Sequence, residues 1–457
     1  MCEKGDIVLT SLIKALGLLD LFSISFGAII GWGVFTLTAD WFEMSGPWGT
    51  FIAAYIGMLM ILPIAICYSI LIPYIPEAGG EYKWTYRTFG SIHGFIAGWW
   101  LYVSYVSIVL LNATAFPVWL RILEPRLVEW GYLYTIGRYK VYLGYIVLSA
   151  LILVIYFLIN YIGVREMGRA QTIMSMILVI GGFSYIILCL SRGNIANTWN
   201  PTPWSLKNSA LGSIVAWLAI APWAYVGFDT VPQAIEEAKI NPRKAFLAIF
   251  TALFVGASFY AFITLSTATL KPWPQFLGTW LATAVTAKEV AGNVGVAIVL
   301  SSALMGILTG INGFMYAASR VLYAMSRDGL LPKALSDVHR RFRIPHKALL
   351  LTFVASLVGP LFGREVLLWF VDIASFGTAL AYLYVAFSTY RQTGNLALNN
   401  NKREHHVKIT AILSSIASLA FIALLSHQLW LNYRLTPFIV IVAYTFLGLL
   451  LYKLRRQ

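Results

Sequence analysis

Two short stretches that contain glycine interrupt long apolar segments of this 457-residue chain. The first lies at residues 27–35, reads GAIIGWGVF and has no charged residue. The second lies at residues 223–233, reads WAYVGFDTVPQ and carries Gly227, Asp229 and Pro232. Glycine and proline weaken helices, so both stretches predict a helix break that leaves backbone groups unpaired. Free N–H groups at a helix start can bind an anion, and free carbonyl groups at a helix end can bind a cation.

The composition of the chain places both breaks inside a membrane protein. Hydrophobic residues make up 59% of the sequence and charged residues only 11%, too few polar side chains to cover a soluble globule of this length. In lipid, unwound backbone is tolerated only where it is buried in protein or lines a cavity. Two interrupted helices at matching places in two halves of a chain indicate the substrate site of a transporter. Windows of about 20 apolar residues predict twelve spans, at residues 15–39, 48–72, 91–120, 141–162, 167–190, 210–235, 245–270, 292–324, 347–362, 366–390, 406–429 and 434–453.

The distribution of charge predicts how the chain is oriented. The net charge is +14, but the lysines and arginines lie in short loops between the spans, which favours membrane orientation over nucleic-acid binding as their role. Most of them fall on the side of the N-terminus, and an even number of spans puts the C-terminus on that side too. We therefore expect a lipid bilayer, the plasma membrane, around the spans and both termini in the cytoplasm. We expect no removable signal peptide, because the residues before Lys14 are few and charged.

Motifs of catalysis and metal binding are missing from the sequence. The three cysteines, Cys2, Cys67 and Cys189, have no CxxC spacing, so neither a disulfide nor a zinc site is expected. Neither GxxxxGK[ST] nor HExxH occurs, and no loop is long enough to form a catalytic domain. The sequence therefore predicts no cofactor, no metal and no enzymatic activity.

Four longer motifs lie in the loops between the predicted spans or at the ends of the spans beside them. They are PEAGGEYKWTYRTFG at 76–90, GVREMGRAQT at 163–172, VGFDTVPQAIEEAKINPRKA at 226–245 and SRVLYAMSRDGLLPKALSDVHRRFRIPHKA at 319–348. In order and spacing, over residues 15 to about 390, they resemble the motifs of amino acid permeases of the amino acid–polyamine–organocation (APC) superfamily. Together the four motifs are specific to the superfamily, but they do not name the substrate.

The resemblance implies a fold and a function. The fold is an all-α membrane protein of twelve transmembrane helices, in which residues 1–190 and 191–400 form a 5+5 inverted repeat with broken first and sixth helices. Residues 401–457 would form two peripheral helices. The function implied is a secondary active transporter or exchanger that carries an amino acid across the plasma membrane by alternating access.

The resemblance also implies how the two breaks hold a zwitterion. The backbone N–H groups of Trp32 and Gly33 would hold the carboxylate, and the carbonyl groups of Ile29, Trp223 and Val226 would hold the ammonium. Glycine lets a ligand approach the main chain closely, although glycines in a membrane helix can also serve helix packing alone. The full candidate site is Ile29, Gly31, Trp32, Gly33, Trp223, Tyr225, Val226, Gly227, Phe228 and Asp229.

Aromatic residues at the breaks have two alternative roles. Trp32 stands where the family usually has a small residue, and its indole either narrows the pocket, favouring a small or slender substrate, or fills space between helices. Trp223 matches a place where the family often has an aromatic residue that closes over the substrate. Tyr225 and Phe228 flank the same break, and aromatic residues in membrane helices also serve as packing groups or interfacial anchors.

Three acidic residues lie at or just after the second break. Asp229 is a functional candidate because a buried charge is costly, and its simpler role is to cap the half-helix that begins at Thr230. Glu236 and Glu237 should lie at the cytoplasmic end of the sixth span, where we expect them to pair with the basic residues that follow, Lys239, Arg243 or Lys244. A role in an inner gate is the alternative.

The coupling ion, a proton or sodium, is left open by the sequence. Many prokaryotic relatives place a lysine in the fifth helix, but this chain has Leu178 at that position, which argues against proton coupling by that route. Sodium would need oxygen ligands from the first and eighth spans. Ser301, Ser302 and Thr309 supply hydroxyl groups, although such groups usually bond to their own helix. Exchange without an ion is the third possibility.

Two rival functions start from the same residues. An amine or polyamine transporter would use the aromatic residues as a cation–π cage and Asp229 as the counter-charge. A nutrient sensor would keep the pocket without transport, but such proteins usually carry a long soluble tail. The partners expected are a small-molecule substrate, an amino acid or an amine, and the lipid bilayer.

Overall fold

The structure is a computed structural model of the 457-residue chain. It describes residues 12–136, 139–362, 364–394, 401–431, 442–446, 448 and 452–453. The long helices are α2 (Leu18–Ile29), α4 (Thr38–Tyr74), α6 (Ser91–Leu120), α7 (Leu143–Ile162), α8 (Val164–Arg192), α12 (Ala245–Ala268), α13 (Ala282–Arg327), α15 (Arg364–Gln392) and α16 (Asn401–Leu431).

Shorter elements connect or extend the long helices. The short α-helices are α3 (Gly33–Thr36), α5 (Gly80–Phe89), α9 (Ala210–Leu218), α10 (Ala221–Tyr225), α11 (Thr230–Ala234) and α14 (His346–Ser356). The strands are β1 (Tyr132–Ile136) and β2 (Tyr139–Tyr142). The 3-10 helices are η1 (Pro125–Leu127), η2 (Ile195–Trp199), η3 (Ile235–Glu237), η4 (Pro242–Lys244), η5 (Trp273–Phe276), η6 (Lys333–Ser336) and η7 (Gly359–Leu361).

Glycine and polar residues mark several helix ends. The N-terminus of α9 is capped by Ser209, whose hydroxyl accepts a hydrogen bond from the N–H of Gly212 at 3.1 Å, as is typical of a serine cap. Between α7 and α8 the chain turns at Gly163, whose φ of +148° suits glycine because it has no Cβ. These residues separate apolar helices that the composition alone would merge.

Most of the predicted spans are present as helices. Within the described residues, nine helices are long and apolar enough to cross a membrane, or ten if α9 and the segment Ala221–Glu237, which meet at a 53° bend, form one span. The predicted span at 347–362 is a shorter apolar helix at His346–Leu361, and the predicted span at 434–453 lies mostly outside the described residues. The protein is thus a helical multi-pass membrane protein, while the count of twelve remains a prediction.

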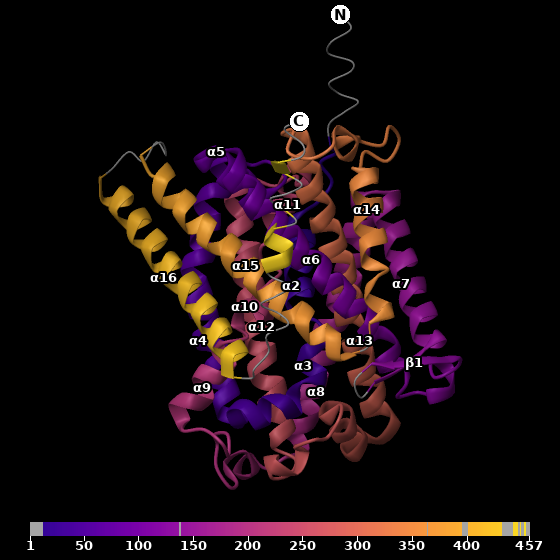
Figure 1. Cartoon of the computed structure of the whole chain (residues 1–457). Coiled ribbons are helices and arrows are strands. Elements are labelled where there is room, and N and C mark those ends of the chain that lie inside the picture. Colours follow the sequence, from indigo (N-terminus) through magenta and orange to yellow (C-terminus); the bar gives the residue numbers. More distant parts are fainter. Residues whose placement is uncertain are drawn as a thin grey trace, which may run out of the picture.

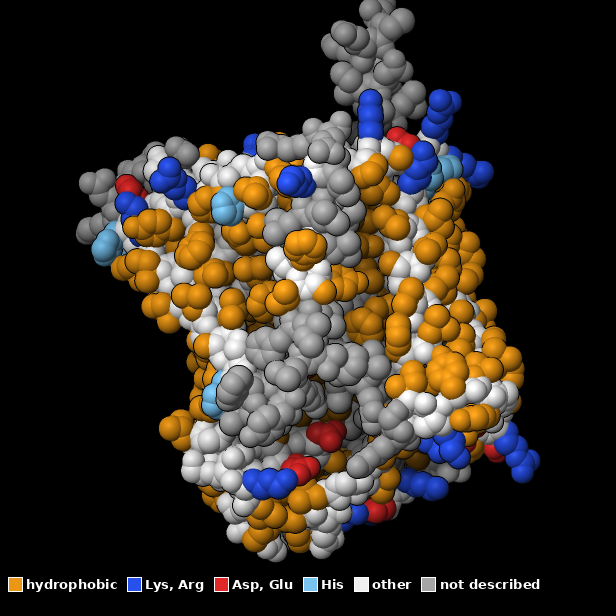
Figure 2. Space-filling model, in the orientation of Figure 1, with side chains coloured by type: hydrophobic (Ala, Val, Ile, Leu, Met, Phe, Trp, Pro, Cys, Tyr) orange, Lys and Arg blue, Asp and Glu red, His pale blue; other side chains and the backbone are white. Residues whose placement is uncertain are grey.

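The helices run between two ends of the molecule (Figure 1). One end, called here the α5 end, holds α5, and the other, the hairpin end, holds β1 and β2. On the face shown in Figure 2, lysine and arginine side chains gather toward the two ends, and hydrophobic side chains cover much of the described surface between them. This distribution is the one expected of a protein whose middle lies in lipid.

The strands β1 and β2 form an antiparallel hairpin, with Thr135 opposite Lys140 and Ile136 opposite Tyr139. The protein is otherwise mostly helical, as expected of an all-α membrane protein, and this short hairpin was not predicted from the sequence. The two runs, YLYTI and YKVY, are rich in aromatic and β-branched residues, which favour strands. Their signal was hidden beside much longer apolar windows, because a search for membrane helices ignores short strands outside the lipid.

The first interrupted helix lies inside the bundle. The helix α2 packs against α8, α12 and α13, while α13 also packs against α6. The helices α15 and α16 pack against each other, α15 also against α6 and α16 also against α4. Non-helical backbone at the end of α2 is therefore surrounded by protein, as a break at membrane depth requires.

Candidate functional site

The first break separates α2 from α3. The helix α2 ends at Ile29, and α3 begins at Gly33 after three residues that belong to neither helix. Ile30 has an extended backbone, with φ −92° and ψ 90°. The interruption predicted within residues 27–35 is therefore present, and it leaves helix-end groups without helical partners.

The second break separates α10 from α11. The helix α10 ends at Tyr225, and α11 begins at Thr230. Between them, Val226 has a non-helical backbone, with φ −55° and ψ 134°. Gly227 has a φ of +133°, a backbone conformation that residues with a Cβ rarely adopt. The sequence again predicted the place of the interruption.

The two breaks touch each other. A Cβ built on Gly227 would lie 2.5 Å from the backbone nitrogen of Ile29 and 2.6 Å from the carbonyl carbon of Ala28. The Tyr260 hydroxyl on α12 lies 2.7 Å from the carbonyl oxygen of Ile29 and 2.6 Å from that of Ala224. The Tyr260 hydroxyl therefore bonds to the ends of both α2 and α10, and the lack of a Cβ at Gly227 lets the two backbones come into contact.

A small cavity of about 30 Å³, called here the central pocket, lies at this meeting point. Six of the ten predicted site residues line it, namely Ile29, Gly31, Trp32, Gly33, Trp223 and Val226. The other lining residues are Ala28, Ile108, Leu111, Asn112 and Tyr260. One water needs about 10–15 Å³ of such cavity volume, so the pocket has room for a few waters and no larger ligand.

Sequence reasoning missed Asn112 and Tyr260. The amide nitrogen of Asn112 donates to the carbonyl oxygen of Ile108 at 2.9 Å, and its buried Oδ1 has no hydrogen-bond partner among the described residues. Both residues are polar groups inside otherwise apolar windows, and a polar group in a membrane span is a functional candidate. That signal was available in the sequence.

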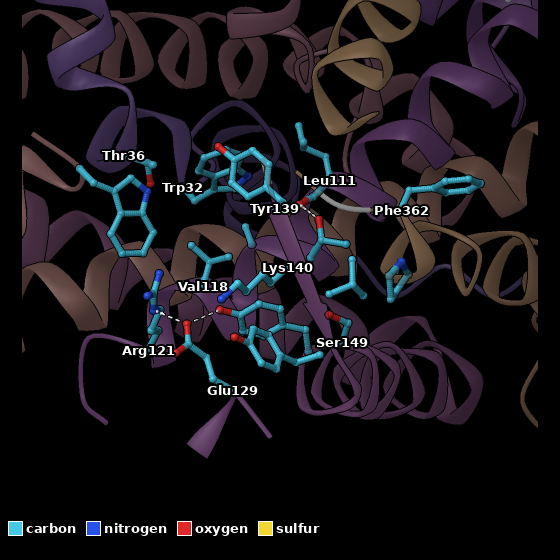
Figure 3. A pocket seen from close by; sticks show the side chains of 17 residues that line it. Trp32, Thr36, Leu111, Val118, Arg121, Glu129, Tyr139, Lys140, Ser149 and Phe362 are labelled. Carbon is cyan, nitrogen blue, oxygen red and sulfur yellow. Dashed lines mark hydrogen bonds and ion pairs between the residues drawn. The ribbon is translucent and has the colours of Figure 1, made fainter. Parts of the chain in front are cut away.

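Trp32 separates the central pocket from a larger cavity at the hairpin end. This outer cavity has a volume of about 590 Å³, and Figure 3 shows the side chains that line it. Trp32 and Leu111 line both cavities. Of the two roles considered for the Trp32 indole, pocket lining therefore agrees with the structure. From the other side, Trp223 packs over Gly33, whose ideal Cβ would lie 2.9 Å from Cη2 of the indole.

Two predicted aromatic residues point away from the central pocket. The Tyr225 hydroxyl donates to the carbonyl oxygen of Ala54 on α4. The ring of Phe228 packs against Tyr68 and Tyr382, with centroids 5.1 and 5.2 Å apart. These contacts are those of packing groups, the alternative considered for both residues. Gly227 also does not line the pocket, because its backbone packs directly against the end of α2 where the two breaks meet.

Asp229 occupies the predicted cap position of α11 but does not cap it through its side chain. Its Oδ1 instead accepts a hydrogen bond from the N–H of Gly227 at 2.7 Å, two residues earlier in the chain. The expected bond to the first turn of α11 is absent because the carboxylate folds back over the break. Asp229 is fully buried and does not line the central pocket, and its Oδ2 has no partner among the described residues.

A second buried carboxylate contacts α11 at Gln233, four residues after Asp229. Glu81 of α5 accepts hydrogen bonds from the Tyr68 hydroxyl at 2.8 Å and from the Gln233 amide at 2.7 Å. Glu81 and Gln233 are both fully buried. This contact fastens α5 to α11, so the second broken helix is tied to the α5 end.

The acidic pair at the end of α11 binds arginines of α13. Both oxygens of Glu237 accept hydrogen bonds from Arg320 at 2.9 Å, and both side chains are fully buried. Glu236 pairs with Arg327 at 2.9 Å and accepts the N–H of Ala78 at 2.8 Å. The predicted partners Lys239, Arg243 and Lys244 were wrong, because α13 packs against α11 and brings distant arginines closer than the neighbouring loop does.

A further ion pair joins α5 to the end of α13. The Lys83 ammonium lies 2.6 Å from Oδ1 of Asp328 and 3.1 Å from Oε2 of Glu77. The Tyr82 hydroxyl donates to the same aspartate at 2.9 Å. Burial and this negative charge raise the pKa of Tyr82 well above its ordinary value, so the phenol remains a proton donor. Together these contacts join α5 to the end of α13 at the α5 end of the molecule.

The oxygen atoms considered for sodium are engaged within the protein. Gln171 of α8 donates from its amide nitrogen to the carbonyl oxygens of Ser23 at 3.1 Å and Thr309 at 3.2 Å. Ser301, Ser302 and Thr309 each donate a side-chain hydrogen bond to a carbonyl of their own helix. The neutral amide of Gln171 therefore occupies the position between α2 and α13 that was considered for sodium. Leu178, at the expected lysine position, is fully buried.

These features define a class of membrane protein, namely helical multi-pass proteins in which two interrupted helices meet inside the bundle, an arrangement typical of secondary transporters. Within that class, the chain belongs to the amino acid permease family of the APC superfamily, which residues 16–432 match.

Individual relatives agree with this assignment. Over 387 aligned residues, the chain is 29% identical to the branched-chain amino acid permease BcaP of Bacillus subtilis (strain 168). The aligned region covers 82% of this chain and 80% of the relative. It is 27% identical to the branched-chain amino acid permease BcaP of Lactococcus lactis subsp. cremoris (strain MG1363), with 81% and 80% covered. The methylthioribose transporter of Bacillus subtilis is 26% identical over 93% of this chain and 91% of its own length.

Proposed function

We propose that the protein is a secondary transporter that moves an amino acid by alternating access across the plasma membrane. The observation that carries the proposal is the contact between two helix breaks at a pocket that lies between a closed α5 end and an open outer cavity. Access from the α5 end requires the ion pairs of Lys83, Glu236 and Glu237 to open. Access from the hairpin end requires Trp32 to move.

The central pocket supplies both kinds of polar group that a zwitterion needs. Among the described residues, no other backbone group accepts a hydrogen bond from the N–H groups of Trp32 and Gly33, so these groups are free to hold the carboxylate. The ammonium would donate to the carbonyl oxygen of Val226 and to Oδ1 of Asn112, which is otherwise unpartnered. The carbonyl of Ile29 already accepts from Tyr260 and has one lone pair left.

The pocket lining favours an aliphatic substrate side chain. Among the described residues that line the pocket there is no charged side chain, and Ile108, Leu111 and Val226 give it an apolar wall. Two of the relatives are named branched-chain amino acid permeases. We therefore propose leucine, isoleucine and valine as the first substrates to test, with Trp32 and Trp223 moving aside to admit them.

The amine carrier is the weaker candidate. That reading needed Asp229 as the counter-charge for an ammonium ion, but the Asp229 carboxylate does not line the central pocket. It bonds instead to the backbone of Gly227. Removal of the substrate carboxylate should therefore abolish recognition, so that 3-methylbutylamine does not compete with leucine.

The proposal includes the arrangement of the chain in the membrane. Residues 1–190 and 191–400 would form the two inverted repeats, with one broken helix in each, and residues 401–457 the peripheral helices. The broken helices lie inside these two segments, at residues 30–32 and 226–229, which supports the division. The excess of lysine and arginine supports a cytoplasmic location for the α5 end and both termini.

The test is transport by the purified protein in liposomes. Vesicles preloaded with unlabelled leucine should exchange it for external [³H]leucine, and isoleucine and valine should compete. The panel includes the other common amino acids and methylthioribose, because one relative is named for that substrate. Absence of uptake or exchange with every compound would overturn the proposal, and it would favour a sensor if the same compounds still bind.

A further inference from the structure

We propose that the outer cavity is a second binding site for the amino acid, reached from the hairpin end before the substrate enters the central pocket. This inference rests on the proposed function. Its volume of about 590 Å³ lies within the range of about 300–1,000 Å³ that is usual for ligand sites. The central pocket, at about 30 Å³, is closed to the same ligand until Trp32 moves.

The outer cavity offers cationic groups for a carboxylate. Arg121, at the end of α6, uses its Nε to bind Oε1 of Glu129 at 2.7 Å, while its guanidinium lies 5.6 Å from the ring centroid of Trp280. Within the described part of the chain, its two terminal amino groups donate no hydrogen bond, and Lys140 of β2 forms no ion pair. A guanidinium with free terminal N–H groups is well suited to hold a carboxylate.

The same cavity offers an anionic group for an ammonium. Glu129 accepts from Arg121 and from the Tyr145 hydroxyl, the latter at 3.3 Å, and both contacts use Oε1. Its second oxygen, Oε2, has no hydrogen-bond donor among the described residues and is left for a ligand. Arg121 and Glu129 lie together on one side of the cavity in Figure 3, and Trp32 and Thr36 lie on the opposite side. A zwitterion thus finds both charges at one place.

A buried hydroxyl without a partner gives an independent sign of a ligand. Ser149 is 1% exposed and lines the outer cavity, and its Oγ has no hydrogen-bond partner among the described residues. It lies one turn after Tyr145 on α7, on the same helix face. Serine in a membrane helix usually bonds to the carbonyl four residues earlier, and a buried polar group left without a partner calls for one.

The apolar part of the cavity fits an aliphatic side chain. Leu111, Ala115 and Val118 follow one face of α6 from Trp32 toward Arg121. An amino acid whose charged end binds Arg121 and Glu129 would place its side chain along this face, against the indole of Trp32. The indole then separates a ligand in the outer cavity from the breaks, and its movement would pass the ligand to them.

The experiment counts leucine molecules bound per chain. Equilibrium binding of [³H]leucine to the full chain in nanodiscs should approach two per chain for the wild type. Arg121→Gln should leave one, and Gly31→Ala should also leave one, because its methyl group takes space in the central pocket without a close contact, 3.6 Å from Oδ1 of Asn112. The double variant should bind none. Arg126→Gln, on the exposed helix η1 nearby, is the matched control and should bind two.

The outcomes separate this inference from the proposed function. One leucine per wild-type chain that is lost in Gly31→Ala and kept in Arg121→Gln would overturn the outer site and leave the transport function standing. Absence of both leucine binding and leucine transport in the wild type would overturn the proposed function and the outer site with it. Two sites that both persist in Arg121→Gln would show that the second site lies elsewhere.

A labelling experiment tests the site without removing a charge. Val118→Cys, combined with Cys2→Ser, should react with a membrane-impermeant thiosulfonate added from the hairpin side, because position 118 lines the outer cavity and is only half-buried, whereas Cys67 and Cys189 are buried. Leucine should slow this reaction several-fold, and it should still do so in Gly31→Ala. Protection that disappears in Gly31→Ala would mean that only the central pocket binds leucine, and the inference would fail.

Discussion

At the scale of single residues, the account depends on Trp32, Gly227 and Asn112. Trp32 lines both cavities and Gly227 lets the two breaks touch, while Asn112 presents an acceptor without a partner. The sequence placed Trp32 and Gly227 at the breaks because glycines stand out in an apolar window. It could not decide where the Trp32 indole points, because that depends on which helices pack around the first break, and it passed over Asn112 as one polar residue in a long span.

Shortening Trp32 should widen substrate selectivity. In Trp32→Ser the indole no longer fills the space between the two cavities, so larger side chains gain access. We expect the ratio of phenylalanine uptake to leucine uptake to rise about tenfold, the usual scale of discrimination by a hydrophobic pocket wall. Initial rates in proteoliposomes measure the ratio, and an unchanged ratio would show that Trp32 does not set the size of the pocket.

A methyl group at Gly227 should disable transport. The added Cβ would lie 2.5 Å from the backbone nitrogen of Ile29, so the breaks must move apart, and a displacement of about 1 Å in a site can cost about 100-fold in rate. Leucine exchange by Gly227→Ala checks this. Gly394→Ala is the control because no described residue lies within 4 Å of a Cβ built there, and exchange by Gly227→Ala at the control rate would contradict the contact.

At the scale of elements, local sequence predicted what is local. Glycine and proline within apolar windows marked the breaks between α2 and α3 and between α10 and α11, and the windows themselves marked most spans. The partners of Glu236 and Glu237 were predicted from the nearest basic residues and are instead on α13, more than 80 residues away in the chain. Pairings of this kind depend on which helices pack together, which periodicity does not report.

The buried pair between η3 and α13 should dominate the stability of the α5 end. Arg320→Met leaves Glu237 buried without its cation, a change that costs about 3–5 kcal/mol. The double variant Glu237→Gln with Arg320→Met should recover much of this loss, because no uncompensated charge remains. Thermal unfolding in detergent measures both. As the control, Lys347→Met removes an exposed ion pair and should change the free energy of unfolding by about 0–1 kcal/mol. A loss in Arg320→Met as small as that in Lys347→Met would contradict the account.

The hydrogen bonds of the Gln171 amide, which join α8 to α2 and α13, predict transport without sodium. Gln171 occupies the carbonyl oxygens of Ser23 and Thr309, so a sodium ion between these helices would have to displace a satisfied amide. Leucine uptake should be equal in sodium and in potassium buffers of the same ionic strength. A clear sodium dependence would show that the cation binds elsewhere or displaces the amide.

At the scale of the whole molecule, ion pairs join α5, η3 and α13 at the α5 end, and the outer cavity reaches Trp32 at the hairpin end. The multi-pass helical architecture and the family follow from composition and loop motifs. The hairpin of β1 and β2, which forms part of the wall of the outer cavity, does not, because short strands outside the lipid contribute little to a search for spans. The conformational state was also beyond the sequence, since it is set by ion pairs between distant helices.

The central claim is that the pocket at the two breaks opens alternately to each side of the membrane. Ile108→Cys, combined with Cys2→Ser, places one thiol in the wall of the central pocket. In sealed vesicles of known orientation, an impermeant thiosulfonate should label this thiol when added from either side, and leucine should slow both reactions. Labelling from one side only, or labelling from both sides that leucine leaves unchanged, would contradict alternating access at this pocket.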